Sequence, residues 1–169
     1  MAFLNPSAVL GTLELENDFV AADFGSGSGG WVIPLAKRLK RGTVYAIDVL
    51  EEPLSVLRSK IKSENISNIK IIKSDVENTS TLQSNSCDLV LMTNLLFGVE
   101  DIDKVIEEGI KVLKKEGRLL IVDWKEDSPL GPGIKISAEE IKKNTEKAGL
   151  KLVKEVDCGI YHWGLFLVK

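Results

Sequence analysis

The chain has 169 residues, of which 44% are hydrophobic and 28% are charged, and its formal net charge is −3. This length suits one globular domain with a sizeable core, spanning residues 1–169. The acidic balance argues against a nucleic-acid binder that works by neutralising phosphates. The N-terminus lacks a signal-peptide pattern, and no apolar run approaches the ~20 residues of a spanning helix, so we expect a cytoplasmic protein without membrane insertion.

At the N-terminus, Asn5 and Pro6 are expected to begin a helix within residues 1–16, a segment that we place over the functional site. Strand-like and helix-like segments then alternate from about residue 18 to 157, which indicates an α/β protein with a mostly parallel sheet. Strands are expected at 19–24, 43–47, 69–73, 88–93 and 118–123. Helices are expected at 29–40, from Pro53 onwards, at 101–114 and after Ser137, which forms a capping box with Glu140.

The end of the chain breaks this alternation. Residues 150–156 and 160–168 are both strand-like, and only Asp157, Cys158 and Gly159 join them. The connection is too short for a parallel crossover, so the two segments must form an antiparallel hairpin. The helix before them is expected to turn Ile141 and Ala148 inward.

The two cysteines, Cys87 and Cys158, stand far apart in the sequence and form no C-x-x-C pattern. We expect reduced thiols in the core or in a turn. Neither a disulfide framework nor a metal site is predicted.

The stretch from Val20 to Gly30 carries the main functional signal, an apolar strand followed by an acid and a glycine-rich turn that leads into a helix. Glycines let the backbone approach a ligand closely, and the first N–H groups of a helix have no partner inside it, so this pattern predicts a nucleotide site. Gly25, Gly27 and Gly30 satisfy the G-x-G-x-x-G dinucleotide pattern. Asp48 follows roughly 20 residues later, as a ribose-binding acid should.

A second interpretation uses Asp23, which lies two residues before Gly25 and gives the pattern D-x-G-x-G-x-G. Here the sequence resembles the class I S-adenosylmethionine-dependent methyltransferases, and among them the quinone-biosynthesis C-methyltransferases and related small-molecule enzymes. A carboxylate suits a cationic ligand and repels a pyrophosphate. The resemblance covers residues 17–169 as a Rossmann-like core. It implies a doubly wound α/β fold with helices on both faces of a seven-stranded sheet, in the order 3-2-1-4-5-7-6 with strand 7 antiparallel.

The implied cofactor is S-adenosyl-L-methionine, bound outside the carboxyl ends of the strands. Asp48 is suited to accept both ribose hydroxyls, and Val49 to face adenine. In the resembling family, the acid at Asp75 takes the adenine amino group. The full set of expected cofactor-binding residues is Asp23, Gly25, Ser26, Gly27, Gly29, Asp48, Val49, Asp75, Val76 and Asn94. For each single acid the structural alternative is a turn, which Asp and Asn commonly make after strands.

The implied reaction is an in-line displacement in which an acceptor attacks the sulfonium methyl group and S-adenosylhomocysteine leaves. A general base is needed only if the acceptor must first lose a proton, and the candidates are Asp123, Tyr161 and His162. The structural alternatives are a loop-stabilising role for Asp123 and a packed position in a strand for His162.

A small-molecule acceptor is favoured. The N-terminal segment and the loop at 124–136 are short covers for its site, so the site is open, small, or completed by a second copy in a homo-oligomer. Three other functions stay open: a scaffold that binds the cofactor without turnover, methylation of a protein or RNA, and a nicotinamide-dependent oxidoreductase. Asp23 and the terminal hairpin both argue against the oxidoreductase.

Overall fold

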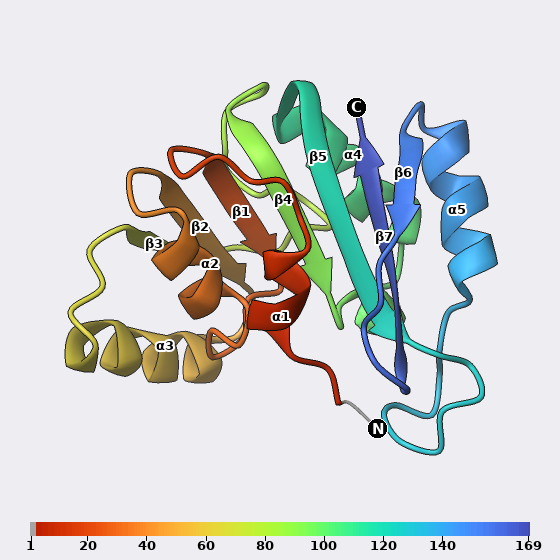
Figure 1. The fold of residues 1–169 in the computed structure, drawn as a ribbon, viewed down its shortest axis with the longest axis horizontal. Helices are drawn as coiled ribbons and strands as arrows, with labels where there is room; N and C mark the ends of the chain where they lie inside the picture. The colour runs from red at the N-terminus through yellow and green to blue at the C-terminus, as the bar shows by residue number, and fades with distance from the viewer. Residues whose placement is uncertain (1–2) are drawn as a thin grey trace.

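Seven strands form one sheet in this computed structural model, which describes residues 3–169 (Figure 1). The strands are β1 (Val20–Phe24), β2 (Thr43–Asp48), β3 (Ile69–Lys73), β4 (Cys87–Thr93), β5 (Leu113–Trp124), β6 (Lys151–Glu155) and β7 (His162–Val168). The helices are α1 (Pro6–Gly11), α2 (Val32–Arg38), α3 (Glu51–Ser63), the 3-10 helix η1 (Leu96–Gly98), α4 (Ile102–Val112) and α5 (Ala138–Lys147).

The strand order is β3-β2-β1-β4-β5-β7-β6. The pairings from β3 through β5 are parallel, whereas β7 is antiparallel to both β5 and β6. The predicted order, the reversed seventh strand and the terminal hairpin are therefore confirmed.

Helices cover both faces of the sheet, and each face has its own apolar core. Helices α1, α2 and α3 pack on one face, while α4 and α5 pack on the other. The central strand β4 serves both cores, because Leu89 and Leu91 point to the first face and Val90 and Met92 to the second. This explains its continuous apolar run, which is typical of a parallel strand buried on both sides.

The predicted starts of two helices are confirmed by their caps. The side chain of Asn5 accepts a hydrogen bond from the backbone N–H of Ala8 at 3.2 Å, directly before Pro6. Ser137 caps α5 by accepting from the N–H of Glu140 at 3.0 Å. Both caps satisfy first-turn N–H groups that have no partner within the helix.

Other boundaries differ from the expectation. Helix α2 begins at Val32 and not at residue 29, because Gly29 has a positive φ of 94° that no α-helix accommodates. Helix α3 begins at Glu51, two residues before Pro53. Ala148 is exposed, since α5 ends at Lys147. The buried partner of Ile141 is Thr145, four residues on and thus on the same helix face.

Strand β5 is longer than the predicted 118–123. It begins at Leu113, directly after α4, because Leu113 already pairs with Cys87 of β4. Inside this longer strand, Glu116 has a φ of +63°, which marks an irregularity just before the predicted start. The pairing with β4 shifts register over the same stretch.

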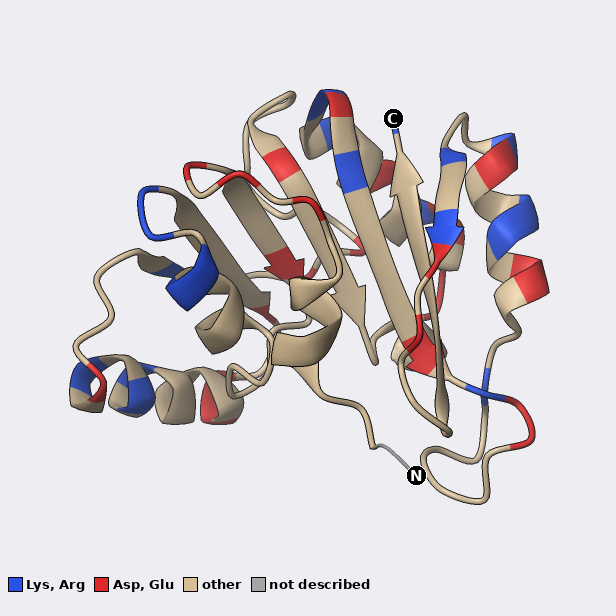
Figure 2. Ribbon diagram, in the orientation of Figure 1, with Lys and Arg blue, Asp and Glu red and all other residues tan. Residues whose placement is uncertain are grey.

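The parallel strands bring carboxylates to one edge of the sheet. Asp23 in β1, Asp48 in β2 and Asp123 in β5 all lie at or next to the carboxyl end of their strand, where Figure 2 shows red strand tips. This edge is where ligands of open α/β sheets bind. Within residues 3–169, no helix is both long and apolar enough to cross a membrane.

Candidate functional site

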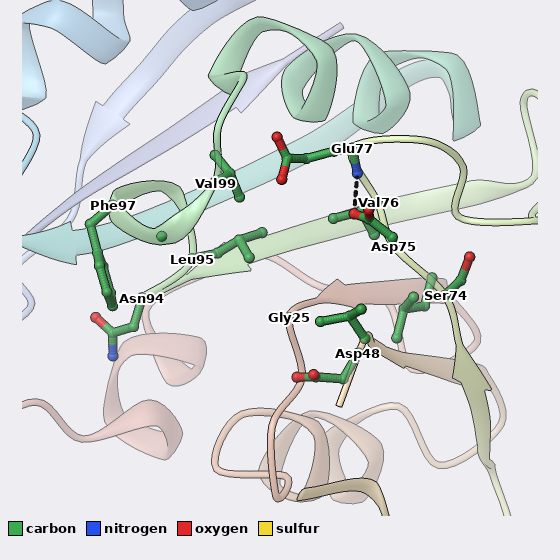
Figure 3. Close-up of a pocket in the computed structure, with 13 residues that line it drawn as sticks. Gly25, Asp48, Ser74, Asp75, Val76, Glu77, Asn94, Leu95, Phe97 and Val99 are labelled. Atoms are coloured by element: carbon green, nitrogen blue, oxygen red, sulfur yellow. Dashed lines mark hydrogen bonds between the residues drawn. The ribbon is translucent and has the colours of Figure 1, made fainter. Parts of the chain in front are cut away.

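A cavity of about 260 Å³ lies at this carboxyl edge, between the ends of β1, β2 and β3 and the segment that follows β4 (Figure 3). Six of the ten residues expected to bind the cofactor line it, namely Gly25, Asp48, Val49, Asp75, Val76 and Asn94. Asp23, Ser26, Gly27 and Gly29 are not among its lining residues. The fold thus gathers residues from four separate strand ends around one hollow.

The glycine loop is held against β2 by its own backbone. The N–H groups of Gly25 and Ser26 donate to the carbonyl of Ile47 at 2.8 and 2.9 Å. The N–H of Gly27 donates to Oδ2 of Asp48 at 2.8 Å. Asp48 therefore fixes the loop and faces the cavity at once. Each of its oxygens carries two lone pairs, so acceptor capacity is left for a ligand hydroxyl.

Close approaches at the glycines distinguish the two readings of the loop. A Cβ on Gly25 would lie 2.8 Å from Cδ1 of Leu95, and one on Gly29 would lie 2.5 Å from Cδ1 of Leu57. A Cβ on Gly30 would meet nothing within 4 Å. The third glycine of the dinucleotide pattern is needed for close helix packing, and Gly30 has no such packing. The crowded positions are Gly25 and Gly29, both in the D-x-G-x-G-x-G pattern.

Two polar side chains at the loop are buried without a hydrogen-bond partner among the described residues. They are the carboxyl of Asp23, which is 1% exposed, and the hydroxyl of Ser26. Burial first, and the negative charge of Asp48 second, raise the pKa of Asp23 well above its usual value. Buried polar groups are rarely left unpaired, so Asp23 and Ser26 call for a partner from outside the chain. Because Asp23 and Asp48 are both acids, they favour a positively charged partner.

Asp75 caps the turn after β3, which was the structural alternative to cofactor binding, and it also lines the cavity. Its Oδ1 accepts from the N–H of Glu77 at 3.0 Å, the bond drawn in Figure 3. Its Oδ2 accepts from the side chain of Asn78 at 2.7 Å. Asn94 is exposed and has a φ of +50°, which turns the chain away from β4.

Several lining residues are not among those expected to bind the cofactor. Leu95, Phe97, Gly98 and Val99 follow β4 and form one side of the cavity, partly as the 3-10 helix η1. Glu77 also lines it and ties two loops together, because its Oε1 accepts from the N–H groups of Glu100 and Asp101. The sequence signal that could have found them is the apolar stretch Leu95–Phe97, which follows the end of β4 and Asn94.

The candidates for a general base lie outside this cavity. Asp123 is fully buried, and its oxygens accept from the N–H groups of Leu96 at 3.2 Å and Trp124 at 2.8 Å. Burial raises its pKa to about 6, against the opposing effect of these backbone bonds. By bonding Leu96 in the segment after β4, Asp123 has the loop-stabilising role that was the structural alternative to a general base. The ring of Tyr161 packs against Phe3 with 5.7 Å between centroids.

His162 has the packed position in a strand. Its ring lies against Trp124 with 4.1 Å between the ring centroids. Both ring nitrogens are buried without a partner among residues 3–169. Burial, and then the positive charge of Lys125, lower the pKa of His162.

We expect the His162→Phe variant to be about 1–2 kcal/mol more stable than wild type at pH 7.5, because it keeps an aromatic ring beside Trp124 and removes unpaired buried nitrogens. The pKa of folded His162 lies below that of an unfolded histidine. Wild type therefore loses stability as pH falls through about 6.5, and the gap to the variant widens. Urea unfolding at pH 7.5 and 5.5 measures both effects. His162→Gln keeps a polar group and should gain nothing, and a less stable His162→Phe would show that the nitrogens have a partner.

The N-terminal segment does not line the cavity. Helix α1 packs on the α2 side of the sheet, where Val9 and Leu10 are buried in the same core as Leu35. Met1 and Ala2 lie outside the described residues. A cover over the site by residues 1–16 stays a prediction.

These features define a doubly wound α/β protein with an acid-flanked glycine loop at its switch point. Residues 22–121 match the methyltransferase domain family. The fold is similar to that of a SAM-dependent methyltransferase from Aquifex aeolicus, with a TM-score of 0.90 and 30% identity over 98% of this chain and 90% of that one. The chain therefore belongs to the class I S-adenosylmethionine-dependent methyltransferase family, whose cofactor is S-adenosyl-L-methionine.

Two curated relatives are similar over part of the chain. A probable cobalt-precorrin-6B C(15)-methyltransferase of Methanocaldococcus jannaschii is 36% identical over 99 residues, which are 58% of this chain and 49% of the relative. A ubiquinone/menaquinone biosynthesis C-methyltransferase of Hydrogenovibrio crunogenus is 32% identical over 107 residues, 62% of this chain and 42% of the relative. The chain spans about half the length of the curated relatives it matches.

Proposed function

We propose that this protein transfers the methyl group of S-adenosylmethionine to a small-molecule acceptor by in-line displacement, in the cytoplasm. The observation that carries the proposal is the carboxyl of Asp23 beneath the glycine loop, which has no hydrogen-bond partner in the described part of the chain and has Asp48 beside it. Two acids at this place favour a ligand that carries positive charge. A pyrophosphate would be repelled there.

In the proposed complex, Asp48 accepts hydrogen bonds from the ribose hydroxyls and keeps the glycine loop in place through Gly27. Val49 and Val76 offer apolar contact to adenine, beside Asp75. A cavity of about 260 Å³ is below the roughly 300 Å³ at which sites begin to enclose a whole drug-sized ligand. We therefore place the nucleoside in the cavity and the amino-acid part over the loop, with Asp23, Ser26 and Gly29 below and Asn94 at its side.

When bound, S-adenosylmethionine supplies an activated methyl group on a positively charged sulfur. The residues of this chain then have to hold the donor, align the acceptor and exclude water. Neither Asp123 nor His162 lies on the cavity wall, so proximity and alignment are the contributions that the geometry supports.

A small acceptor is supported by the names of the relatives, which methylate cobalt-precorrin-6B or act in ubiquinone and menaquinone biosynthesis. It is also supported by the residues at the carboxyl edge near β7. Phe3, Leu130, Ile134 and Ile160 are exposed apolar side chains there. Phe3 contacts Tyr161, and Gly131, next to Leu130, packs on Trp124. An apolar face of this kind favours an acceptor with an apolar part.

Ligand binding to the purified protein tests the cofactor. At a concentration of 100 times its dissociation constant, a ligand adds about 2.7 kcal/mol of stability. For a chain of this size we therefore expect S-adenosylmethionine and S-adenosylhomocysteine each to raise Tm by about 5–10 °C. NAD at the same concentration should leave Tm unchanged. Stabilisation by NAD alone would overturn the proposal.

Turnover is tested by following S-adenosylhomocysteine formation by mass spectrometry with a panel of small metabolites, a total RNA sample and a denatured protein mixture. The proposal expects product with one class of small molecule and none with RNA or protein. Methylation of RNA or protein would replace the proposed acceptor class. Tight cofactor binding with no product from any of the three would favour a scaffold without turnover.

A further inference from the structure

One wall of the cavity is an irregular segment, residues 94–99, which we call the wall segment. Asn94, Leu95, Phe97, Gly98 and Val99 from it all line the cavity (Figure 3). Its internal support is slight, with the N–H of Gly98 donating to the carbonyl of Leu95 at 3.0 Å. A segment that forms so much of a ligand site needs to be held from outside.

The neighbouring strand β5 supplies this support in two ways: the carbonyl of Val122 accepts from the N–H of Asn94 at 2.8 Å, and Asp123 adds its side chain. Its Oδ2 accepts from the N–H of Leu96 at 3.2 Å, 27 residues away in the sequence. Its Oδ1 accepts from the N–H of Trp124 at 2.8 Å, and the backbone of Phe97 helps to lower the pKa of the carboxyl. Asp123 is completely buried and does not line the cavity, so it acts on a ligand only through the wall segment.

The support reaches the glycine loop through Leu95. With Leu96 fixed by Asp123, the side chain of Leu95 lies directly over Gly25, where a Cβ would come within 2.8 Å of Cδ1. A change at Asp123 is thus expected to move Leu95, and with it the surface that faces Gly25. Asp123 is thus linked to the glycine loop by two contacts, the hydrogen bond from Leu96 and the packing of Leu95 on Gly25.

The chemistry of this position supports a specific role. Burying a carboxylate costs free energy of folding. If the carboxyl only filled space, an apolar side chain could replace it without loss of stability. The groups that bond it are the backbone N–H groups of Leu96 and Trp124, and on the neighbouring strand β7 its pairing partner is Trp163. The charged or titratable groups next along the strands, Lys125 and His162, do not contribute to its pKa: Lys125 donates to the carbonyl of Gly159, and His162 lies against Trp124.

We infer that Asp123 is a positioning residue for cofactor binding, whose carboxylate holds the wall segment in the shape that seats the nucleoside. This inference rests on the proposed cofactor site. It assigns Asp123 no contact with the cofactor and no proton transfer. The segment and its anchor act together as one side of the site.

The test compares Asp123→Asn with Asp88→Asn. Asp88 also accepts from a backbone N–H of a neighbouring strand, that of Val20, but at the opposite, amino end of the sheet. Asp123→Asn should bind S-adenosylhomocysteine about tenfold more weakly in calorimetry, because one charged acceptor for the wall segment is lost. Its Tm without ligand should be equal to or above that of wild type, since a buried charge is removed. Asp88→Asn should bind as wild type does.

Nuclear magnetic resonance of the wild type gives a second readout that a space-filling role would not produce. The amide signal of Leu96 should titrate with a midpoint near pH 6, the pKa of Asp123, and its hydrogen exchange should slow when S-adenosylhomocysteine binds. The titration should vanish in Asp123→Asn.

Unchanged affinity in a folded Asp123→Asn would overturn the inference while leaving the cofactor site intact. Should that variant not fold, the wild-type Leu96 signal decides: a signal that fails to titrate near pH 6 or fails to respond to the ligand overturns the inference, and one that does both upholds it. Absence of any S-adenosylhomocysteine binding to wild type would remove the proposed function, and this inference with it.

Discussion

Replacing Asp48 with alanine should weaken S-adenosylmethionine binding by about 10- to 150-fold, the range that corresponds to a charged hydrogen bond of about 1.5–3 kcal/mol. Two losses combine in this variant. The proposed bonds to the ribose disappear, and so do the bonds to the N–H groups of Gly27 and Leu50 that fix the glycine loop and the start of α3. Isothermal titration calorimetry with S-adenosylmethionine measures the change.

Asp103→Ala is the matched control for this experiment. Asp103 is an exposed acid in the first turn of α4 and lies outside the cavity. Its removal makes the same change of net charge without touching the loop, so affinity should stay as in wild type. If Asp48→Ala kept wild-type affinity, the ribose assignment would be wrong, and the nucleoside would have to lie elsewhere along the edge.

Gly25→Ala is expected to have a large effect on both stability and cofactor affinity. An alanine there must adopt a φ of +74°, which costs about 1–2 kcal/mol for an L-residue, and its Cβ must displace Leu95 from 2.8 Å. The displaced Leu95 belongs to the cavity wall, so binding suffers as well as folding. Urea unfolding and calorimetry with S-adenosylmethionine, carried out on the same preparation, measure the two effects separately.

Gly30→Ala tests whether the effect is specific to the crowded glycines. Gly30 stands five residues on in the same loop, with no positive φ and with open space around a Cβ. We expect it to change neither stability nor affinity by more than a few tenths of a kcal/mol. Equal damage from both substitutions would favour the dinucleotide reading of the loop, in which the third glycine is the one that packs against its neighbours.

The strands, the parallel crossovers and the terminal hairpin could be predicted because each piece of evidence was local. The apolar runs gave the strands, the alternation with helical spacing indicated parallel crossovers, and the three residues Asp157–Gly159 forced a hairpin. The resemblance to a known family then supplied the order. Boundaries were less accurate where a contact between distant segments decided them. Leu113, for example, pairs with Cys87 and so begins β5 earlier than its own neighbourhood suggests.

The candidate site was predictable in part for the same reason. Asp48, Asp75 and Asn94 stand at strand ends, and parallel strands bring these ends together, so their gathering around the cavity follows from the sheet. The wall formed by Leu95, Phe97 and Val99 was not among the expected cofactor-binding residues. Leu96 in this wall donates its N–H to the buried Asp123, which is distant in sequence, and no local pattern records such a bond.

The sequence by itself determined the class of the fold, the acid-flanked glycine loop and the identity of the polar groups at the strand ends, because these depend on periodicity, turn chemistry and residue type within short windows. Only the tertiary structure decided which of those groups face the cavity, that Asp23 is buried with no hydrogen-bond partner among residues 3–169, and that Gly29 is crowded while Gly30 has open space around it. These outcomes depend on how strands and loops far apart in the chain are packed side by side, and that packing sets distances of a few ångströms that a linear pattern does not contain.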